Sequence, residues 1–332
     1  MNTNQKLYSR IDALKHVRVL VVGDVMVDFY LWSEVNRISP EAPVPVALVT
    51  SESSFLGGAA NVAHNAHALG AQVSLVGVVG NDSGGEVLKQ LLSENNIANI
   101  GIFTEVDRQT TVKKRVVSGT QQLLRIDNET TSLISVPTQE KIKLTLLSEI
   151  QKSDVVIISD YYKGFFTQDI ISVIFTEAKK HNKKVFVDSK DKNLMKFSGA
   201  YIIKPNKEEA ESFAQERFTK NYSNLEDIGK RLVEIFNSKV VVTLGKDGTA
   251  FFEDESFCHK TTKAQQVFDV SGAGDTMIAT IATTIAAGGT LEEAVDFSNI
   301  AAGYVISHFG TGVCSNSILK ELIENDIKLD NC

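Results

Sequence analysis

The run DVSGAGD, which ends at Asp275, places a carboxylate directly behind a stretch of small residues. Gly272, Ala273 and Gly274 carry little or no side chain, so successive backbone N–H groups can point at one anion. The apolar stretch 276–287 predicts a helix, whose amino end would add its positive dipole. A carboxylate beside an anion is repelled unless it accepts a proton from an attacking hydroxyl, which suits phosphoryl transfer to an alcohol. The alternative is an ordinary glycine-rich turn with an Asp that complements the helix dipole.

Composition limits the classes of partner and the compartment. The chain has 332 residues, of which 43% are hydrophobic and 23% charged, and its net charge of -7 disfavours nucleic acid or an anionic membrane as the main partner. No run approaches the roughly 18 apolar residues of a membrane span, and the N-terminus lacks a signal peptide pattern. We therefore expect a cytoplasmic protein. Its three widely spaced cysteines suggest neither a disulfide framework nor a zinc site.

Short β-branched runs alternate with amphipathic segments along most of the chain, and the runs end in polar or small residues. This alternation predicts an α/β fold with a doubly wound, mostly parallel sheet. Ligands of such sheets bind beyond the carboxyl ends of the strands, so the polar residues there should share one cleft. The expected strands are 17–23, 73–80, 155–159, 185–187, 201–203 and 240–242.

Two stretches, at about 26–50 and 108–127, do not follow the βα rhythm. The second contains apolar runs at 112–117 and 121–126 around the turn Ser118-Gly119-Thr120, which predicts a hairpin. We interpret both stretches as a small β-strand lid on a single domain that covers 1–332. The alternative is that they are edge strands of the main sheet.

Four motifs carry a resemblance to a known family. They are DVMVD at 24–28, GGAANVA at 57–63, NKEE at 206–209 and DVSGAGD at 269–275. Their order and spacing, from about residue 17 to 315, resemble the ribokinase (PfkB) family of sugar kinases. The resemblance implies a ribokinase-like fold and an ATP-dependent carbohydrate kinase that uses Mg²⁺.

Within this family, three further stretches are most similar to kinases that phosphorylate D-glycero-β-D-manno-heptose 7-phosphate at O1. They are RISPEAPVPV at 37–46, QQLLRID at 121–127 and SDYYKG at 159–164. The resemblance implies formation of the 1,7-bisphosphate in ADP-heptose biosynthesis, which supplies a lipopolysaccharide core precursor. In bifunctional relatives a nucleotidyltransferase domain follows, whereas this sequence ends at Cys332, so we expect a kinase that acts alone.

The acceptor sugar is expected beside the first strand. Asp24 and Asp28 stand four positions apart, and a carboxylate can accept hydrogen bonds from two sugar hydroxyls. The resemblance assigns at least one of them to the sugar, and the alternatives are a helix-capping Asp and a surface Asp. Gly57 and Gly58 permit a close backbone approach, and Asn61 could point at the same sugar.

The nucleotide and its metal are expected at two other motifs. Asn206 and Glu209 lie three positions apart at a helix start, where they could also form a capping box. The resemblance implies that the motif with Lys207 and Glu208 arranges ATP phosphates and Mg²⁺, the metal being held through water by Asn206 and Glu209.

A glycine-containing segment after the sixth expected strand is a second nucleotide candidate. Thr243, Gly245 and Gly248 suit binding by backbone groups, although a hairpin turn is the alternative. Asn299 resembles the family residue that lines the adenine pocket.

A phosphorylated acceptor also requires cations near the cleft. Lys163, Lys190 and Lys204 follow expected strands, while Arg37 and Arg125 could reach in from the lid. We take Arg125, Lys163 and Lys190 as candidates for the acceptor phosphate, although any single surface cation is more often simply solvated.

The resemblance also suggests a monovalent cation and an oligomer. Asp269 and the carbonyl near Ser271 resemble the K⁺ site of some family members, which makes K⁺ a candidate cofactor. An exposed apolar lid face would favour a homodimer whose lids meet.

The sequence also bears on other possible functions. A nucleotide-dependent reductase is disfavoured because no Gly-x-Gly-x-x-Gly motif follows the first strand, and a P-loop kinase because its motif is absent. A non-catalytic module that binds a sugar phosphate or nucleotide remains an alternative, as does a kinase of another sugar. Retention of Asp275 with its glycines favours an enzyme.

Overall fold

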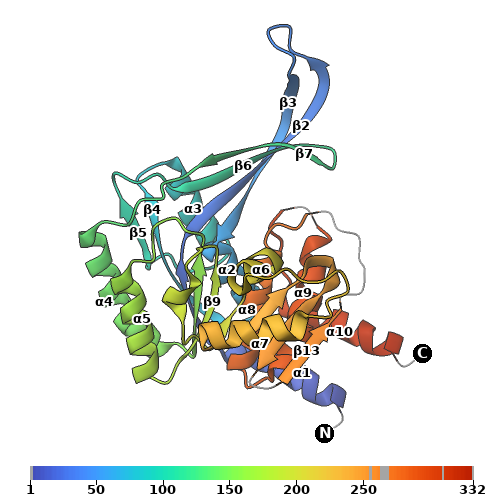
Figure 1. The fold of residues 1–332 in the computed structure, drawn as a ribbon. Helices are drawn as coiled ribbons and strands as arrows, with labels where there is room; N and C mark the ends of the chain where they lie inside the picture. Colours follow the sequence, from blue (N-terminus) through green and yellow to red (C-terminus); the bar gives the residue numbers. More distant parts are fainter. Residues whose placement is uncertain (1–2, 254–255, 262–268, 309, 331–332) are drawn as a thin grey trace.

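The computed structural model describes residues 3–253, 256–261, 269–308 and 310–330, and it confirms the predicted α/β architecture. A nine-stranded sheet has the order β13-β12-β11-β10-β9-β8-β1-β4-β5 (Figure 1). Strands β12 and β13 are antiparallel to their neighbours, whereas the others pair in parallel. Its strands are β1 (Arg18–Gly23), β4 (Gln72–Gly80), β5 (Ile102–Glu105), β8 (Val155–Asp160), β9 (Lys184–Ser189), β10 (Ile202–Ile203), β11 (Lys239–Thr243), β12 (Thr249–Glu253) and β13 (Ser256–Lys260).

Helices cover both faces of this sheet, because parallel strands are apolar on both sides. In β1, Leu20 and Val22 join one core while Val19 and Val21 join the other, as strand alternation requires. The first core is covered by α4 (Val136–Lys152), α5 (Gln168–Lys180), α6 (Lys207–Ala214) and α7 (Leu225–Phe236). The second is covered by α2 (Ala59–Ala68), α3 (Ser83–Glu94), α8 (Ala273–Ala286) and α9 (Leu291–Ile306).

A third, smaller core lies at the chain ends, where α1 (Thr3–Ala13) and α10 (Asn316–Asp330) pack with α9. Short 3₁₀ turns complete the fold at η1 (Leu14–His16), η2 (Leu194–Phe197) and η3 (Gly245–Asp247). Among the described helices, none combines the length and the apolar character that a membrane crossing needs.

The two stretches outside the βα rhythm form a separate four-stranded sheet, here called the small sheet, of order β3-β2-β6-β7. Strands β6 (Thr111–Ser118) and β7 (Gln121–Asn128) form the predicted hairpin. The alternative that these strands extend the main sheet is wrong. The first lid stretch also extends beyond its expected end at residue 50. Strand β3 (Pro45–Gly58) pairs with β2 (Val25–Ile38) as far as Gly58. The outer ends of β2 and β3 project from the body as an arm (Figure 1).

Strand pairing gives the small sheet two distinct faces. Asp28 pairs with Lys113, and Arg115 pairs with both Tyr30 and Arg125, so these side chains share one face. We call this the inner face. The residues between them in sequence, such as Phe29 and Lys114, point to the opposite face.

Candidate active site

The carboxyl ends of the central strands bring the predicted polar residues together. Strand β1 lies between β8 and β4, which makes its carboxyl end the switch point of the sheet. Asp24 follows β1, Asp160 ends β8, and Asp188 lies near the end of β9. All three carboxylates are buried. These polar residues therefore lie along one edge of the sheet.

The glycine-rich run forms the amino end of α8. The helix begins at Ala273, earlier than the expected position 276, because Gly272 takes the left-handed conformation, with φ 80°, and starts it as N-cap. The first N–H groups of a helix have no partner within it and are free for an anion. A Cβ on Gly272 would lie 2.8 Å from Asn61 Nδ2, so a side chain here would displace Asn61.

Asp275 lies in the first turn of α8 and is 3% exposed. Asn61 Nδ2 donates to its Oδ2 at 2.8 Å, and the Tyr161 hydroxyl donates to its Oδ1 at 2.7 Å. Burial raises the pKa of Asp275 to about 6, against the lowering effect of the Asn61 hydrogen bond, and the charge of Asp188 raises it further. The hydrogen bond from Tyr161 opposes that rise. A carboxylate with a pKa near neutrality is suited to accept a proton.

Tyr161 is a site residue that the sequence analysis missed. Burial and the nearby Asp275 raise the pKa of its hydroxyl well above the usual value, so it stays a hydrogen-bond donor. Its backbone N–H also donates to Asp24 Oδ2 at 2.8 Å. The residue follows β8 within the motif SDYYKG, but no spacing in the sequence links it to Asp275, which is 114 positions away.

Asp24 holds the loop after β8 in place. Its Oδ2 accepts the N–H of Tyr161 and, at 3.1 Å, that of Lys163. Burial and the charge of Asp160 raise the pKa of Asp24 to about 7, despite these two donors. Asp24 thus supports the element that carries Tyr161.

Asp28 lies on the inner face of the small sheet and forms an ion pair with Arg115. It is 5% exposed, so the alternative of a surface carboxylate is wrong. A Cβ on Gly57 would lie 2.5 Å from Asp28 Oδ2, which explains the glycine there. The next residue, Gly58, is the N-cap of α2 and leads the chain to Asn61 beside Asp275.

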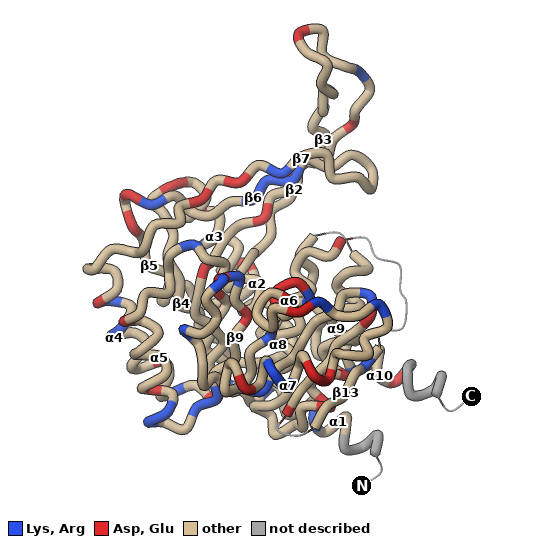
Figure 2. The backbone as a smooth tube through the Cα atoms, viewed as in Figure 1, with Lys and Arg blue, Asp and Glu red and all other residues tan. Residues whose placement is uncertain are grey.

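The inner face also collects cations. Lys113 Nζ lies 5.0 Å from the centroid of the Tyr161 ring. Burial lowers the pKa of Lys113, Asp28 opposes that effect, and the charges of Arg115, Arg125 and Lys163 add to it. We call Lys113, Arg115, Arg125 and Lys163 the cationic cluster. Figure 2 shows the basic residues along β6. Lys113 and Arg115 were not predicted, although their alternation on one strand was a usable signal.

Two predicted members of this cluster are paired with acids. Lys163 Nζ lies 2.7 Å from Glu129, and Arg125 Nε lies 2.9 Å from Asp127 Oδ1. Arg37, by contrast, is exposed on the projecting arm, where it pairs with Val46. The structure therefore brings Arg125 and Lys163, but not Arg37, to the inner face.

Lys190 lies on the predicted nucleotide side rather than with the cationic cluster. Its Nζ is 3.4 Å from Asp188 Oδ1 and 3.0 Å from Glu209 Oε1. These acids raise the pKa of Lys190 above its usual value, with Asp188 as the main cause. Asp188 is shared with Lys204, whose Nζ lies 2.8 Å from its Oδ2.

The two predicted nucleotide elements are neighbours. Asn206 and Thr243 form a parallel bridge, and the Thr243 N–H donates to the Pro205 carbonyl at 3.1 Å. Asn206 and Glu209 form the capping box that was the alternative, with distances of 2.7 and 2.9 Å. In the described part of the chain, no group of three or more His, Cys, Asp or Glu could hold a metal. Mg²⁺ commonly uses one or two carboxylates together with substrate phosphates, which this sparse donor set would suit.

The segment after β11 is hydrogen-bonded to the loop between α6 and α7 through Tyr222. Gly245 begins the 3₁₀ turn η3 and Gly248 follows it. Because β11 and β12 are antiparallel, the segment is also a hairpin connection. Tyr222 donates to Asp247 at 2.7 Å and accepts from Lys207 at 3.2 Å.

The other predicted nucleotide residues lie on α9 and α6. Thr249, just after the η3 turn, donates to Asn299 Oδ1 at 2.7 Å, which places Asn299 near this turn. Glu208 is exposed in the first turn of α6.

Asp269 connects the small sheet to the glycine-rich run. It accepts hydrogen bonds from the Tyr30 hydroxyl at 2.7 Å and from the Ser271 N–H at 2.8 Å, and a weaker one from the Gly310 N–H at 3.4 Å. Burial raises the pKa of Asp269, but these donors outweigh burial and leave the pKa below its usual value. An ionised Asp269 thus fixes the turn that begins α8.

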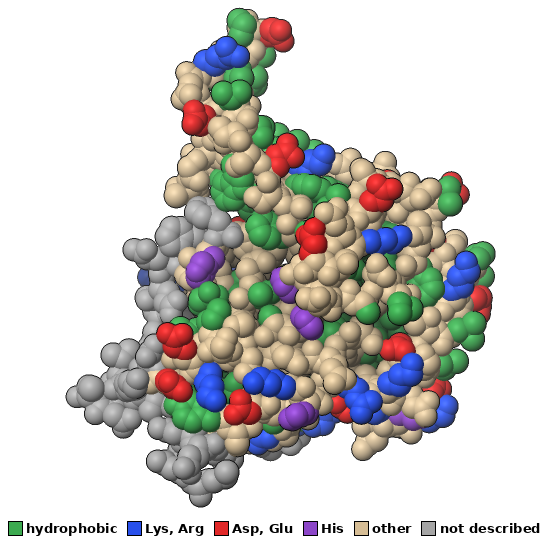
Figure 3. Space-filling view, turned by 180° about the vertical axis from the view of Figure 1, so that it is seen from behind, with side chains coloured by type: hydrophobic (Ala, Val, Ile, Leu, Met, Phe, Trp, Pro, Cys, Tyr) green, Lys and Arg blue, Asp and Glu red, His purple; other side chains and the backbone are tan. Residues whose placement is uncertain are grey.

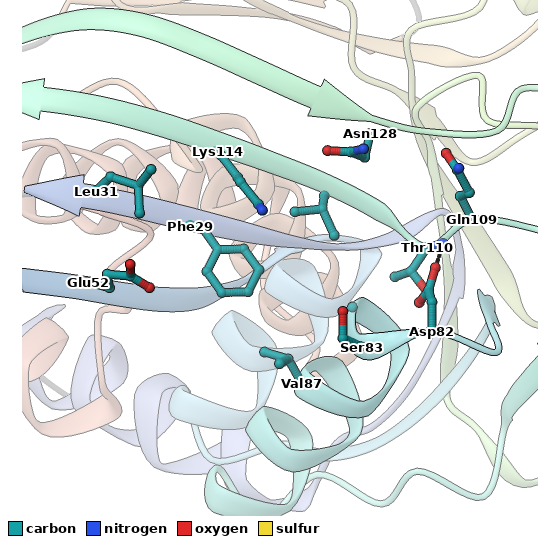
Figure 4. A pocket seen from close by; sticks show the side chains of 12 residues that line it. Phe29, Leu31, Glu52, Asp82, Ser83, Val87, Gln109, Thr110, Lys114 and Asn128 are labelled. Carbon is teal, nitrogen blue, oxygen red and sulfur yellow. Dashed lines mark hydrogen bonds between the residues drawn. The ribbon is translucent and has the colours of Figure 1, made fainter. Parts of the chain in front are cut away.

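A cavity of about 480 Å³ lies away from Asp275, on the opposite face of the small sheet. Phe29 and Lys114 line it from β2 and β6, and Val87 lines it from α3 (Figure 4). Asp82, at the amino end of α3, accepts the Thr110 N–H at 2.8 Å within it. None of the predicted site residues is among its lining residues.

Curated relatives match nearly all of the chain. The chain is 41% identical over 305 residues to the bifunctional protein HldE of Sulfurimonas denitrificans. The match covers 92% of this chain and 64% of the relative. It is 42% identical over 311 residues to the bifunctional protein HldE of Desulfatibacillum aliphaticivorans, a match that covers 93% of this chain and 63% of the relative. The chain thus spans somewhat less than two thirds of the length of these relatives.

Solved structures share the fold. Phosphofructokinase-2 from Escherichia coli, in complex with substrates and products, matches with a TM-score of 0.76 and 20% identity over 93% of this chain and 98% of that one. Ribokinase from Arabidopsis thaliana, complexed with ribose and ATP, matches with a TM-score of 0.72 and 19% identity over 93% and 99%. The model of the pfkB family carbohydrate kinases matches residues 17–318, so the chain belongs to this family of ATP-dependent sugar kinases.

Proposed function

We propose that this kinase transfers the γ-phosphoryl group of ATP to O1 of D-glycero-β-D-manno-heptose 7-phosphate, giving the 1,7-bisphosphate for ADP-heptose synthesis. One observation carries the proposal. A buried carboxylate, Asp275, opens α8, and the cationic cluster lies across the ring of Tyr161 from it. An acceptor between them would present a hydroxyl to Asp275 and an anionic group to the cluster.

At the reacting end, ionised Asp275 accepts the O1 proton as O1 attacks phosphorus. The new O1–P bond forms as the bond between phosphorus and the β–γ bridging oxygen breaks, and ADP leaves. Asn61 and Tyr161 hold the two carboxylate oxygens in a fixed orientation before the proton arrives. The first amides of α8 face the phosphoryl oxygens, where fixed N–H dipoles stabilise developing charge. Mg²⁺ bound with ATP would supply further positive charge to the phosphates.

At the other end, Lys113 and Lys163 are the cations proposed to hold the 7-phosphate, with Arg125 closing the site from β7. Lys113 is the strongest candidate, because burial and its like-charged neighbours lower its pKa and an arriving phosphate relieves both costs. Arg115 is engaged by Asp28 and positions that carboxylate toward the sugar.

The nucleotide is proposed to lie across Thr243, the η3 turn and the first turn of α6. The bridge between Asn206 and Thr243 and the hydrogen bond from Thr249 to Asn299 support this placement, since they bring every predicted nucleotide element to one area. Asn206 and Glu209 would hold Mg²⁺ through water, because the capping box and Lys190 already engage both Glu209 oxygens. A K⁺ site beside Asp269 and Ser271 belongs to the same proposal.

We further infer a homodimer in which the small sheets of two copies meet. Large apolar side chains are exposed toward the end of the arm, namely Ile38, Val44, Leu48 and Val49 at 62%, 51%, 64% and 43%. Figure 3 shows hydrophobic side chains along the arm. A second copy that covers them would remove this apolar area from water.

The test is a coupled ADP-release screen with heptose 7-phosphate, heptose, fructose phosphates, ribose and adenosine. We expect turnover with heptose 7-phosphate, and a loss of about 10²- to 10⁴-fold in kcat for Asp275→Asn. Activity on ribose alone would overturn the substrate assignment, and no ADP release with any sugar would favour a binding module. Asp275→Asn turnover within a few fold of the parent would show that Asp275 is not the base.

A paired comparison tests the 7-phosphate site. A lost hydrogen bond to a charged group costs about 1.5–3 kcal/mol, so Lys113→Met should raise the KM for heptose 7-phosphate by about 10- to 100-fold. Activity on any unphosphorylated sugar should not change. Lys114→Met is the matched control, because it removes a cation from the same strand on the opposite face. Equal effects of both variants would remove Lys113 from the site.

A further inference from the structure

Lys204 is the most deeply buried cation beside the amino end of α8. It follows β10 and is 2% exposed, with its Nζ 2.8 Å from Asp188 Oδ2. A Cβ added to Gly274 would lie 3.5 Å from this Nζ and 3.6 Å from Asp188 Oδ2. The ammonium group therefore lies close to the first turn of α8.

Positive charge is concentrated at this position. The amino end of a helix is equivalent to about half a positive charge, so a buried ammonium group beside it is repelled. Asp188 and Asp275 offset part of that repulsion, but Asp188 already has a second cationic partner in Lys190 at 3.4 Å. A neutral side chain at position 204 would satisfy the packing and leave Asp188 paired. Two sources of positive charge converge on one point, and an incoming anion is what both would stabilise.

We propose that Lys204 is a catalytic residue that contacts the transferring phosphoryl group, rather than a ligand of the acceptor's own phosphate. The inference rests on the proposed phosphoryl transfer, and it assigns Lys204 to the donor side of the cleft. Asp188 acts as the positioning residue: its Oδ2 holds the Lys204 ammonium and its Oδ1 faces Lys190.

The position also connects the base to the nucleotide. Asp188 raises the pKa of Asp275, and the charge of Lys204 lowers it, so both groups act on the buried base. On the other side, Lys190 continues from Asp188 to Glu209. The phosphoryl oxygens would then lie between Asp275 and the ion pairs formed by Lys204, Asp188, Lys190 and Glu209. The Lys204 ammonium group would stabilise the negative charge that develops there.

The experiment compares the full chain with Lys204→Met, Asp188→Asn/Lys204→Met and Lys192→Met. The double variant removes both charges of the buried pair, so its fold does not depend on an unpaired ion. Lys192→Met removes an exposed lysine near Lys190 and serves as the control. Thermal unfolding of each variant establishes that it is folded. Two readouts follow: kcat and KM with the best sugar of the screen, and calorimetric affinity for MgADP with and without aluminium fluoride, which mimics the phosphoryl group in flight.

We expect Lys204→Met and the double variant to lose about 10²- to 10³-fold in kcat, as for removal of a transition-state donor, with little change in the KM for the sugar. Aluminium fluoride should tighten MgADP binding to the parent and to Lys192→Met but not to either Lys204 variant. A folded double variant with kcat within a few fold of the parent would overturn the assignment to Lys204. So would a rise in the KM for the phosphorylated sugar alone, which would place Lys204 at the acceptor phosphate. An inactive parent would instead contradict the proposed function.

Discussion

The Tyr161 hydroxyl offers a direct test of how the base is tuned. Tyr161→Phe keeps the ring that lies beside Lys113 and removes only the donor to Asp275 Oδ1. That hydrogen bond lowers the pKa of Asp275, so its loss must raise it. Burial and the charge of Asp188, which push the pKa upward, are unchanged. In the variant, Asp275 should therefore hold its proton more tightly and act as a base only at higher pH.

The expected shift follows from the strength of a charged hydrogen bond. Such a bond contributes about 1.5–3 kcal/mol, and about 1.36 kcal/mol corresponds to one pKa unit, so the shift is about 1–2 units. Asp275 starts from a pKa of about 6. At pH 7 the ionised fraction then falls from about 0.9 to between about 0.5 and 0.1, which lowers kcat about 2- to 10-fold. At about pH 9 the loss should largely disappear.

The assay is kcat as a function of pH between about 5.5 and 9.5, with both substrates saturating, so that the acid limb reports the base in the bound complex. Tyr162→Phe is the control, because it removes the same hydroxyl from an adjacent tyrosine that is 61% exposed. We expect the acid limb of Tyr161→Phe to move to higher pH while that of Tyr162→Phe stays with the parent. An unmoved acid limb combined with an equal loss of kcat at every pH would refute this reasoning.

Two further outcomes are expected. Asp275 binds its proton more tightly in the folded chain than the ordinary value of 3.8 allows, so stability falls as pH rises from there to about 6, by up to about 3 kcal/mol. Asp275→Asn should therefore raise the unfolding temperature at pH 8 but not at pH 4, and equal melting shifts at both pH values would contradict this. For the dimer, Ile38→Asp/Leu48→Asp should give the monomer mass in light scattering, whereas Leu144→Asp, on an exposed position of α4, should not. A parent of monomer mass would contradict the interface.

The main sheet was predictable because its strands are buried on both faces and read as continuous apolar runs. The length of β3 was not predictable. Its outer part is largely exposed, and the residues from Ser51 to Ser54 show no apolar alternation. They are strand residues because β2 pairs with them, a fact of tertiary structure that propensity does not encode.

The candidate active site could also be predicted only in part. Asp275 and its glycines were predicted because base and anion amides are contiguous in the sequence, and the structure keeps them together in α8. Tyr161 and Lys113 were missed because their roles depend on register. Lys113 reaches the inner face only through the pairing of β6 with β2 opposite Asp28, and one residue of slip would turn it away. A single sequence fixes the alternation of a strand but not its partner.

The pKa of Asp275 results from opposing effects that come from several helices, strands and loops. Burial raises the pKa of Asp275, while its hydrogen-bond donors and the charge of Lys204 lower it. The structure combines both, because Asn61 comes from α2, Tyr161 from the loop after β8, and Lys204 from the end of β10. Gly272 makes this possible, since a side chain there would displace Asn61. The value of this glycine therefore lies as much in admitting Asn61 as in exposing amides to the phosphoryl group.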